Sequence, residues 1–135
     1  MILEGLLAVI QPFTIVLIAI GVVVGIIFGS IPGLTATMAI VMFLPATYSM
    51  TASQGISMLM ALYIGGISGG LISAILLNIP GTPSSVATVF DGGPMAKKGQ
   101  AGKALGTGVV FSFFGTIIGI ALLVVLTPIL CDVAL

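Results

Sequence analysis

The sequence predicts an all-α fold: a polytopic membrane protein whose helices are broken, or turn back within the membrane, at Pro-Gly pairs. Only 4% of its 135 residues are charged, whereas a soluble domain carries about 25%. Residues 5–90 contain no charged side chain, and 59% of the chain is apolar. This composition excludes a soluble globular domain and a disordered chain, and zero net charge excludes a nucleic-acid-binding protein. We therefore expect a single membrane domain over residues 1–135.

Four apolar segments follow one another along the chain, over about residues 13–30, 38–46, 56–79 and 107–130. As helices, the third and fourth are about 36 Å long, enough to cross a hydrocarbon core of roughly 30 Å. The second is only about 14 Å long, so it is a half-helix. It is either the second half of a broken span or one arm of a re-entrant hairpin. The start of the chain has no basic region, so we expect the first segment to stay as a membrane helix rather than be a cleaved signal peptide.

The only strongly polar stretch is a predicted loop over about residues 88–106. It contains all three cationic residues of the chain, Lys97, Lys98 and Lys103. The positive-inside rule places this loop in the cytoplasm. Segment 56–79 then runs inward, segment 107–130 runs outward and the turn at 47–55 lies outside. The Asp91-Gly92 pair suggests a turn within the loop. The side of the N-terminus stays open, because the path of residues 13–46 has two solutions.

Glycines recur at helical spacing on two of the apolar segments. Glycines four residues apart share one helix face and let a second backbone approach closely, so we expect these positions to pack helices together. They are Gly21, Gly25 and Gly29 in the first segment and Gly65, Gly66, Gly69 and Gly70 in the third. As an alternative, the doubled glycines could loosen the third segment into a hinge. The alternative function is a small glycine-packed membrane scaffold without transport activity of its own.

Two related Ile-Pro-Gly sequences interrupt the apolar segments, at residues 31–33 and 79–81. A broken helix exposes N–H and C=O groups, which are costly in lipid unless protein, water or a ligand satisfies them. Transporters use such breaks, because half-helix N-termini face anionic groups and freed carbonyls coordinate cations. Hydroxyls follow both breaks: Thr35 and Thr37 after the first, and Thr82, Ser84 and Ser85 after the second. The alternative is a pair of turns at the membrane surface.

The sequence argues against an enzyme. It contains no histidine, so a serine–histidine dyad is impossible and the commonest general base and metal ligand is missing. Gly102-Lys103 is followed by alanine rather than serine or threonine, so it is not part of a P-loop. We expect no catalytic residue, no cofactor and no certain metal site.

Five stretches taken together resemble one known family. They are Gly25-x3-Gly29-x2-Pro32-Gly33-Leu34-Thr35, Leu44-Pro45-Ala46-Thr47, Tyr63-x-Gly65, Ala74-Ile75-Leu76-Leu77-Asn78-Ile79-Pro80-Gly81-Thr82, and the run from Asp91-Gly92-x-Pro94-Met95-Ala96 to Ala104-Leu105-Gly106. These look like the N-terminal portion of the TctA family, the large permease subunit of the tripartite tricarboxylate transporters. The resemblance covers about residues 21–120. It departs from the family at residues 67–70, where Ile-Ser-Gly-Gly stands in place of Tyr-Gly-Gly-Ser.

The resemblance implies a subunit for secondary active uptake of tricarboxylates or related carboxylates by symport, in a multi-pass permease of the bacterial inner membrane. The implied coupling ion is Na⁺. The implied partners are a small four-helix membrane subunit and a periplasmic solute-binding protein, besides the carboxylate substrate and the lipid bilayer. The predicted substrate-binding residues are Pro32, Gly33, Thr35, Asn78, Pro80, Gly81 and Thr82. A Na⁺ site is expected near Asn78, Thr82 and Asp91.

Overall fold

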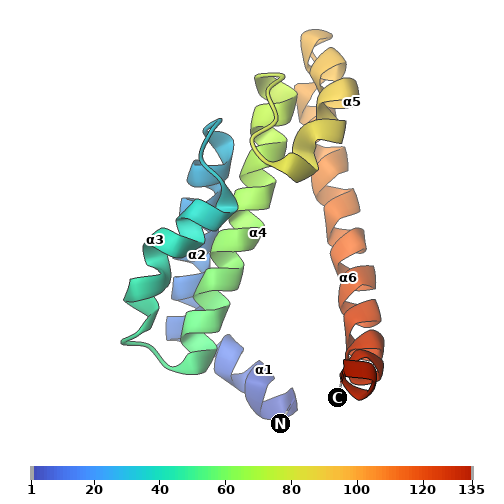
Figure 1. Ribbon diagram of the computed structural model, residues 1–135. Helices are drawn as coiled ribbons and strands as arrows, with labels where there is room; N and C mark the ends of the chain where they lie inside the picture. The colour runs from blue at the N-terminus through green and yellow to red at the C-terminus, as the bar shows by residue number, and fades with distance from the viewer. Residues whose placement is uncertain (1, 135) are drawn as a thin grey trace.

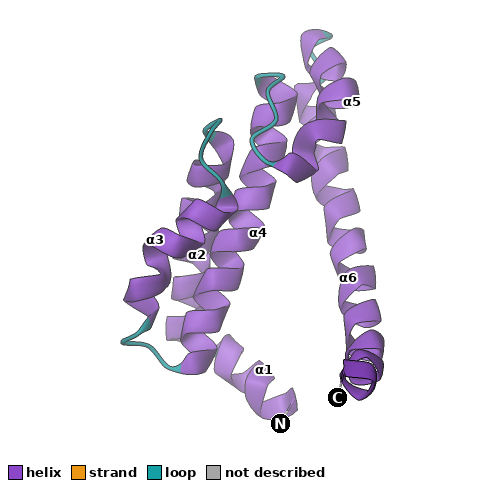
Figure 2. Cartoon of the chain, in the orientation of Figure 1, coloured by secondary structure: helices purple, strands orange, loops and turns teal. Residues whose placement is uncertain are grey.

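The computed structural model describes the backbone of residues 2–134 and the side chains of residues 5–131, so the side chains of Glu4 and Asp132 lie outside the described part. All regular structure in this part is helical (Figures 1 and 2). The elements are α1 (Ile2–Ile10), α2 (Pro12–Ser30), α3 (Ala36–Thr47), α4 (Ala52–Leu76), the 3-10 turn η1 (Pro83–Ser85), α5 (Val86–Lys97) and α6 (Ala101–Ala134). Three helices, α2, α4 and α6, are long and apolar enough to cross a membrane. The predicted all-α membrane fold is therefore confirmed.

The chain runs along α2, returns along α3, and then follows α4 in the same direction as α2 (Figure 1). Gly21 lies beside Ala61, and Gly29 lies beside Gly66, so the two long helices are parallel. The connecting helix α3 has 12 residues and is about 18 Å long. Of the two paths that the sequence left open for residues 38–46, the structure shows the arm of a re-entrant hairpin rather than the second half of a broken span. The first residues of α2 and α4 consequently lie at the same end of the molecule.

A close contact between α2 and α4 forms the core of the fold. The buried face of α2 consists of residues three or four positions apart: Thr14, Leu17, Gly21, Gly25 and Gly29. A Cβ atom added to Gly21 would lie 2.9 Å from the Met58 carbonyl oxygen. One added to Gly25 or Gly29 would overlap the carbonyl oxygens of Leu62 or Gly66. Only glycine fits at this separation of the two backbones, and the contact is made within a single chain.

The side of α3 that faces this pair completes a small apolar cluster. Ala39 of α3 packs with Leu17, Met58 and Leu62, all of them buried. The rings of Phe28 and Phe43 meet edge to face at 6.5 Å. Leu62 and Ala39 are fully buried, so the core lies where α2, α3 and α4 meet.

Each end of α4 has a recognisable cause. At its start, Thr51 and Gln54 form a capping box, in which the Thr51 N–H donates to Gln54 Oε1 at 3.3 Å and the Gln54 N–H donates to Thr51 Oγ1 at 3.5 Å. At its end, Asn78 has a φ of 57°. Asparagine is one of the few residues that adopts this left-handed conformation readily, and it terminates the helix there. Between these ends α4 is continuous, so the doubled glycines do not form a break.

Residues 86–97, most of which were predicted to lie in a loop, form the helix α5. The Asp91-Gly92 pair lies inside this helix and is not a turn. The physical reason is packing: a Cβ on Gly92 would lie 2.7 Å from Ile75 Cγ1, and one on Gly93 would overlap Asn78 Oδ1. The two glycines let α5 close against the end of α4, so they serve helix contact rather than chain reversal.

The last helix, α6, leaves the rest of the fold. Near its start it packs against α5 and α4, with Leu71 of α4 filling the space beside Gly108. Farther along, α6 diverges from α4 (Figure 1). Its side chains are exposed throughout residues 109–131.

Candidate functional site

The second Pro-Gly break returns the chain alongside α4. After Asn78 the backbone reverses and descends beside the last turns of the helix (Figure 1). A Cβ on Gly81 would lie 3.0 Å from the Cα of Gly70, and a Cβ on Gly70 would lie 2.7 Å from Thr82 Cγ2. Gly70 precedes Asn78 by eight residues, which corresponds to about 12 Å along the helix axis. The break therefore brings Thr82 back beside Gly70, six residues before the last residue of α4.

The first break also ends beside α4. The Leu34 N–H donates to the Ile31 carbonyl at 3.1 Å, which closes a turn. Gly33, with a φ of +98°, allows this turn. Thr35 then caps α3, since its Oγ1 accepts from the Met38 N–H at 3.3 Å. The next residue packs on α4, because a Cβ on Gly66 would lie 2.5 Å from the Ala36 Cβ.

The doubled glycines of α4 allow close contacts with two different segments of the chain. Gly65 and Gly69 face α2, where added Cβ atoms would overlap the carbonyl oxygens of Val22 and Ile26. Gly66 and Gly70 face the segments that follow the two breaks, at Ala36 and Thr82. Adjacent residues on a helix point in directions about 100° apart, so a pair of glycines opens two faces. This arrangement brings both broken segments against one helix.

The residues after the two breaks line a common cavity of about 280 Å³, which we call the hydroxyl pocket. Its lining residues are Thr35, Ala36, Thr37, Tyr63, Ile67, Thr82, Pro83 and Ser84. Tyr63 and Ile67 lie near the centre of α4, which spans Ala52–Leu76. The pocket thus sits near the middle of a membrane-spanning helix, the depth at which transporters bind their substrates.

Neutral oxygen and nitrogen groups supply the chemistry of the hydroxyl pocket. Thr82 Oγ1 and Ser84 Oγ lie 3.1 Å apart and share a hydrogen bond. Behind them, the buried Ser85 hydroxyl accepts from the Thr82 N–H at 3.2 Å and donates to the Thr82 carbonyl at 2.8 Å, which fixes this turn. Tyr63 is 45% exposed and Thr37 is exposed, and both residues line the pocket. With the positive N-terminal end of α3 beside them, these groups suit an anion or the oxygen shell of a small cation.

Most of the other predicted substrate-binding residues do not line this pocket. Pro32, Gly33 and Pro80 are exposed and are not among its lining residues. Gly81 is buried behind the pocket, against Ser73 Oγ and the carbonyl oxygen of Gly29. Of the seven predicted residues, Thr35 and Thr82 line the pocket.

The three residues of the predicted Na⁺ site have different surroundings. Thr82 is buried, whereas Asn78 and Asp91 are exposed. The Asn78 side chain lies against Gly93 of α5. Among the residues that the structure describes, no three His, Cys, Asp or Glu side chains group as metal ligands would.

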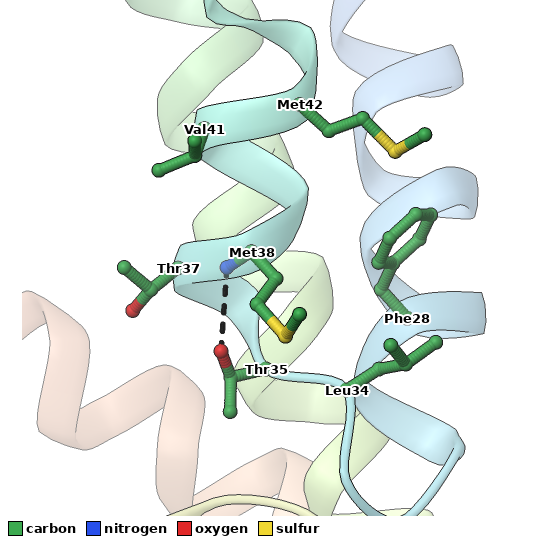
Figure 3. Close-up of a pocket in the computed structure, with 7 residues that line it drawn as sticks. All are labelled: Phe28, Leu34, Thr35, Thr37, Met38, Val41 and Met42. Atoms are coloured by element: carbon green, nitrogen blue, oxygen red, sulfur yellow. Dashed lines mark hydrogen bonds between the residues drawn. The ribbon is translucent and has the colours of Figure 1, made fainter.

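An apolar groove of about 590 Å³ lies on the other side of the start of α3. Its lining residues are Phe28, Leu34, Thr35, Thr37, Met38, Val41 and Met42 (Figure 3). Thr35 and Thr37 belong to both cavities. The N-terminal turn of α3 therefore separates a polar space from an apolar one.

Sequence reasoning did not include Tyr63 and Ile67 among the site residues. Their signal is the face they share with Gly66 and Gly70, at spacings of three and four residues. The glycines mark the positions where a broken segment touches α4, so the larger residues on that face line the adjoining cavity. Recognising this requires knowing which helix receives the broken segments.

A comparison with protein families places the chain in one of them. The family model described as "Tripartite tricarboxylate transporter TctA family" matches residues 15–135. A curated protein of Agrobacterium vitis, named "Uncharacterized 52.8 kDa protein in TAR-I ttuC' 3'region", is 41% identical over 124 residues, which cover 92% of this chain and 25% of that protein. The chain thus spans about a quarter of the length of this relative. No solved structure matches the chain.

Proposed function

Because the chain belongs to the TctA family of tripartite tricarboxylate transporters, we propose that it forms the N-terminal portion of a permease for tricarboxylates or related carboxylates in the bacterial inner membrane. The observation that carries this proposal is the hydroxyl pocket, where two Pro-Gly-broken segments meet at the middle of α4. Such a meeting point of broken helices is the place where secondary transporters hold their substrates.

In this proposal the pocket binds a carboxylate without a cationic side chain. The hydroxyls of Thr37, Tyr63 and Ser84 donate to carboxylate oxygens, and the N-terminal end of α3 contributes a partial positive charge. Each hydrogen bond to a charged group contributes about 1.5–3 kcal/mol. With neutral donors, the binding affinity is the sum of several modest contacts. A small rearrangement that breaks one or two of them releases the substrate. A transporter needs that balance, since it must release what it binds.

The proposed coupling ion is Na⁺, with Thr82 as the member of the predicted site that lines the pocket. Transport follows alternating access, in which the hydroxyl pocket opens to one side of the membrane at a time. The partners are a small four-helix membrane subunit and a periplasmic solute-binding protein that delivers the substrate.

The same proposal gives a topology. With the lysine-containing connection between α5 and α6 in the cytoplasm, α4 runs inward. Since α2 is parallel to α4, it also starts on the periplasmic side. The scaffold alternative is disfavoured by packing, because the glycine faces that would contact a partner chain already contact other segments of the same chain.

The test is Na⁺-dependent citrate uptake by the full-length permease expressed with its two partners. The double substitution Thr82→Val with Ser84→Ala keeps the side-chain volumes but removes two hydroxyls from the pocket. We expect uptake to fall by about tenfold or more, the effect of losing at least one hydrogen bond to a charged group. The matched control is Thr116→Val on the exposed face of α6, where the hydroxyl only donates to the Ser112 carbonyl. Undiminished uptake by the double variant at normal membrane abundance would exclude the pocket as the binding site.

A further inference from the structure

The three lysines of the chain gather at one corner of the molecule, where α5 ends and α6 begins. Lys97 and Lys98 close α5, Lys103 lies in the first turn of α6, and all three are exposed. We call these three residues the lysine corner. It is at the opposite end of the molecule from the two chain termini (Figure 1). No other lysine or arginine occurs in the sequence, so this corner is the only place where an anion meets cationic side chains.

A tight, hydrogen-bonded turn holds the lysine corner in shape. Gly99 has a φ of +76°, and its N–H donates to the Ala96 carbonyl at 2.9 Å. The Gln100 N–H donates to the Met95 carbonyl at 2.9 Å, which completes a Schellman-type helix end. The Gln100 carbonyl then accepts from the Ala104 N–H at 3.1 Å and starts α6. The lysines are therefore carried by two helix ends rather than by a loose loop.

The length of α6 places this corner at the depth of lipid headgroups. The helix has 34 residues, which corresponds to about 51 Å, against a hydrocarbon core of roughly 30 Å. Its apolar stretch begins near residue 107. The first six residues of α6, with Lys103 among them, therefore extend about 9 Å beyond the apolar stretch. This is the layer in which phospholipid phosphates lie.

The charges at the corner lack an acidic counterpart in the adjacent sequence. The nearest acidic residue in sequence, Asp91, lies in the middle of α5 and precedes Lys97 by six positions, which corresponds to about 9 Å along the helix. Lys103 occupies the first turn of α6, where the positive end of a helix disfavours a further cation. An anion bound here would relieve this repulsion. Three lysines at a membrane surface together favour an anionic lipid by on the order of a hundredfold.

An exposed aromatic side chain next to the corner distinguishes a lipid from a free anion. Phe90 of α5 is 75% exposed. It lies seven residues before Lys97, so the two side chains share a helix face about 10 Å apart. We propose that the lysine corner binds the phosphate of an anionic phospholipid, with Phe90 alongside its acyl chain. The inference is independent of what the hydroxyl pocket transports.

The experiment uses the full-length permease, purified and equilibrated with mixtures of phosphatidylglycerol and phosphatidylcholine. Native mass spectrometry counts the lipids that stay bound. We expect the wild-type protein to retain phosphatidylglycerol in preference to phosphatidylcholine. The K97Q/K98Q/K103Q variant should show a preference that is lower by about tenfold or more, since each lysine contributes to the attraction.

The matched control is K97R/K98R/K103R, which keeps the charges and should keep the preference. The single variant K103Q provides a milder change if the triple variant is poorly produced, and it should lose part of the preference. Equal retention of phosphatidylglycerol by the wild-type protein and the glutamine variant would overturn the proposal. Displacement of the lipid by millimolar inorganic phosphate or citrate would also overturn it, because it would assign the corner to a soluble anion.

Discussion

At the scale of residues, the same tripeptide meets two different physical requirements. Gly33 of the first break needs its positive φ and has open space around it. Gly81 of the second break has no positive φ, but a Cβ there would overlap Ser73 Oγ and the Gly29 carbonyl oxygen. The first glycine therefore serves a turn and the second serves close packing. The shared Ile-Pro-Gly sequence alone does not distinguish these two roles.

The first residue-scale prediction concerns Gly81. We expect Gly81→Ala to destabilise the permease by about 1–3 kcal/mol, the usual cost of adding volume where backbone atoms cannot move away. The measurement is the midpoint of thermal aggregation in detergent, followed by size-exclusion chromatography. Gly102→Ala is the control, since nothing lies within 4 Å of a Cβ at that position. Equal midpoints for the two variants would show that the second break does not pack as described.

A second residue-scale prediction concerns Asn78, whose left-handed conformation ends α4. Glycine adopts this conformation freely, whereas a β-branched residue pays about 1–2 kcal/mol for it. We expect Asn78→Gly to melt close to the wild-type temperature and Asn78→Val to melt several degrees lower. The same thermal assay compares them. If both variants lost the same stability, the contact of the asparagine side chain with Gly93 would matter more than its backbone conformation.

At the scale of elements, sequence reasoning placed the breaks but not their consequences. Proline and glycine at 32–33 and 80–81 interrupt helices for local reasons, so both interruptions could be predicted. The direction of the chain after each break depends on where Gly66 and Gly70 offer space on α4, and this is a tertiary fact. Residues 91–94 (Asp-Gly-Gly-Pro) are turn-forming residues that predict a loop, yet two glycines let this segment pack as a helix against α4. The short helix α1 was not predicted, because its 9 residues lie before the first predicted span and are too few to cross a membrane.

The element-scale prediction tests whether the two broken segments face each other. Thr37 follows the first break and Ser84 follows the second, and both line the hydroxyl pocket. In a permease without other cysteines, including Cys131→Ser, we expect Thr37→Cys and Ser84→Cys to be joined by a short bifunctional thiol reagent. The joined segments should resist separation when the α3–α4 connection is cut by an engineered protease site. The pair Thr37→Cys and Thr116→Cys is the control, since Thr116 lies on an exposed face of α6. Equal cross-linking of both pairs would contradict the shared pocket.

At the scale of the whole molecule, the fold consists of a packed part and an open part. The packed part is α2, α3 and α4, whose glycine contacts and apolar cluster fix their relative positions. The open part is α6, which shares contacts near its start and exposes residues 109–131. The hydroxyl pocket lies between the packed part and the segment that follows the second break, and the lysine corner lies where α5 ends and α6 begins.

The parallel pairing of α2 and α4 also has a consequence for the order in which the chain is made. During synthesis α2 enters the bilayer before α4, and residues 31–51 separate the two helices. Until α4 follows, the glycine face of α2 contacts only lipid, which its many valine and isoleucine residues allow. By contrast, α4 contains several serines and glycines and gains most from a partner that is already inserted. We therefore expect the newly inserted α4 to pack against α2, which is already in the membrane. The connecting helix α3 would then fold back against both.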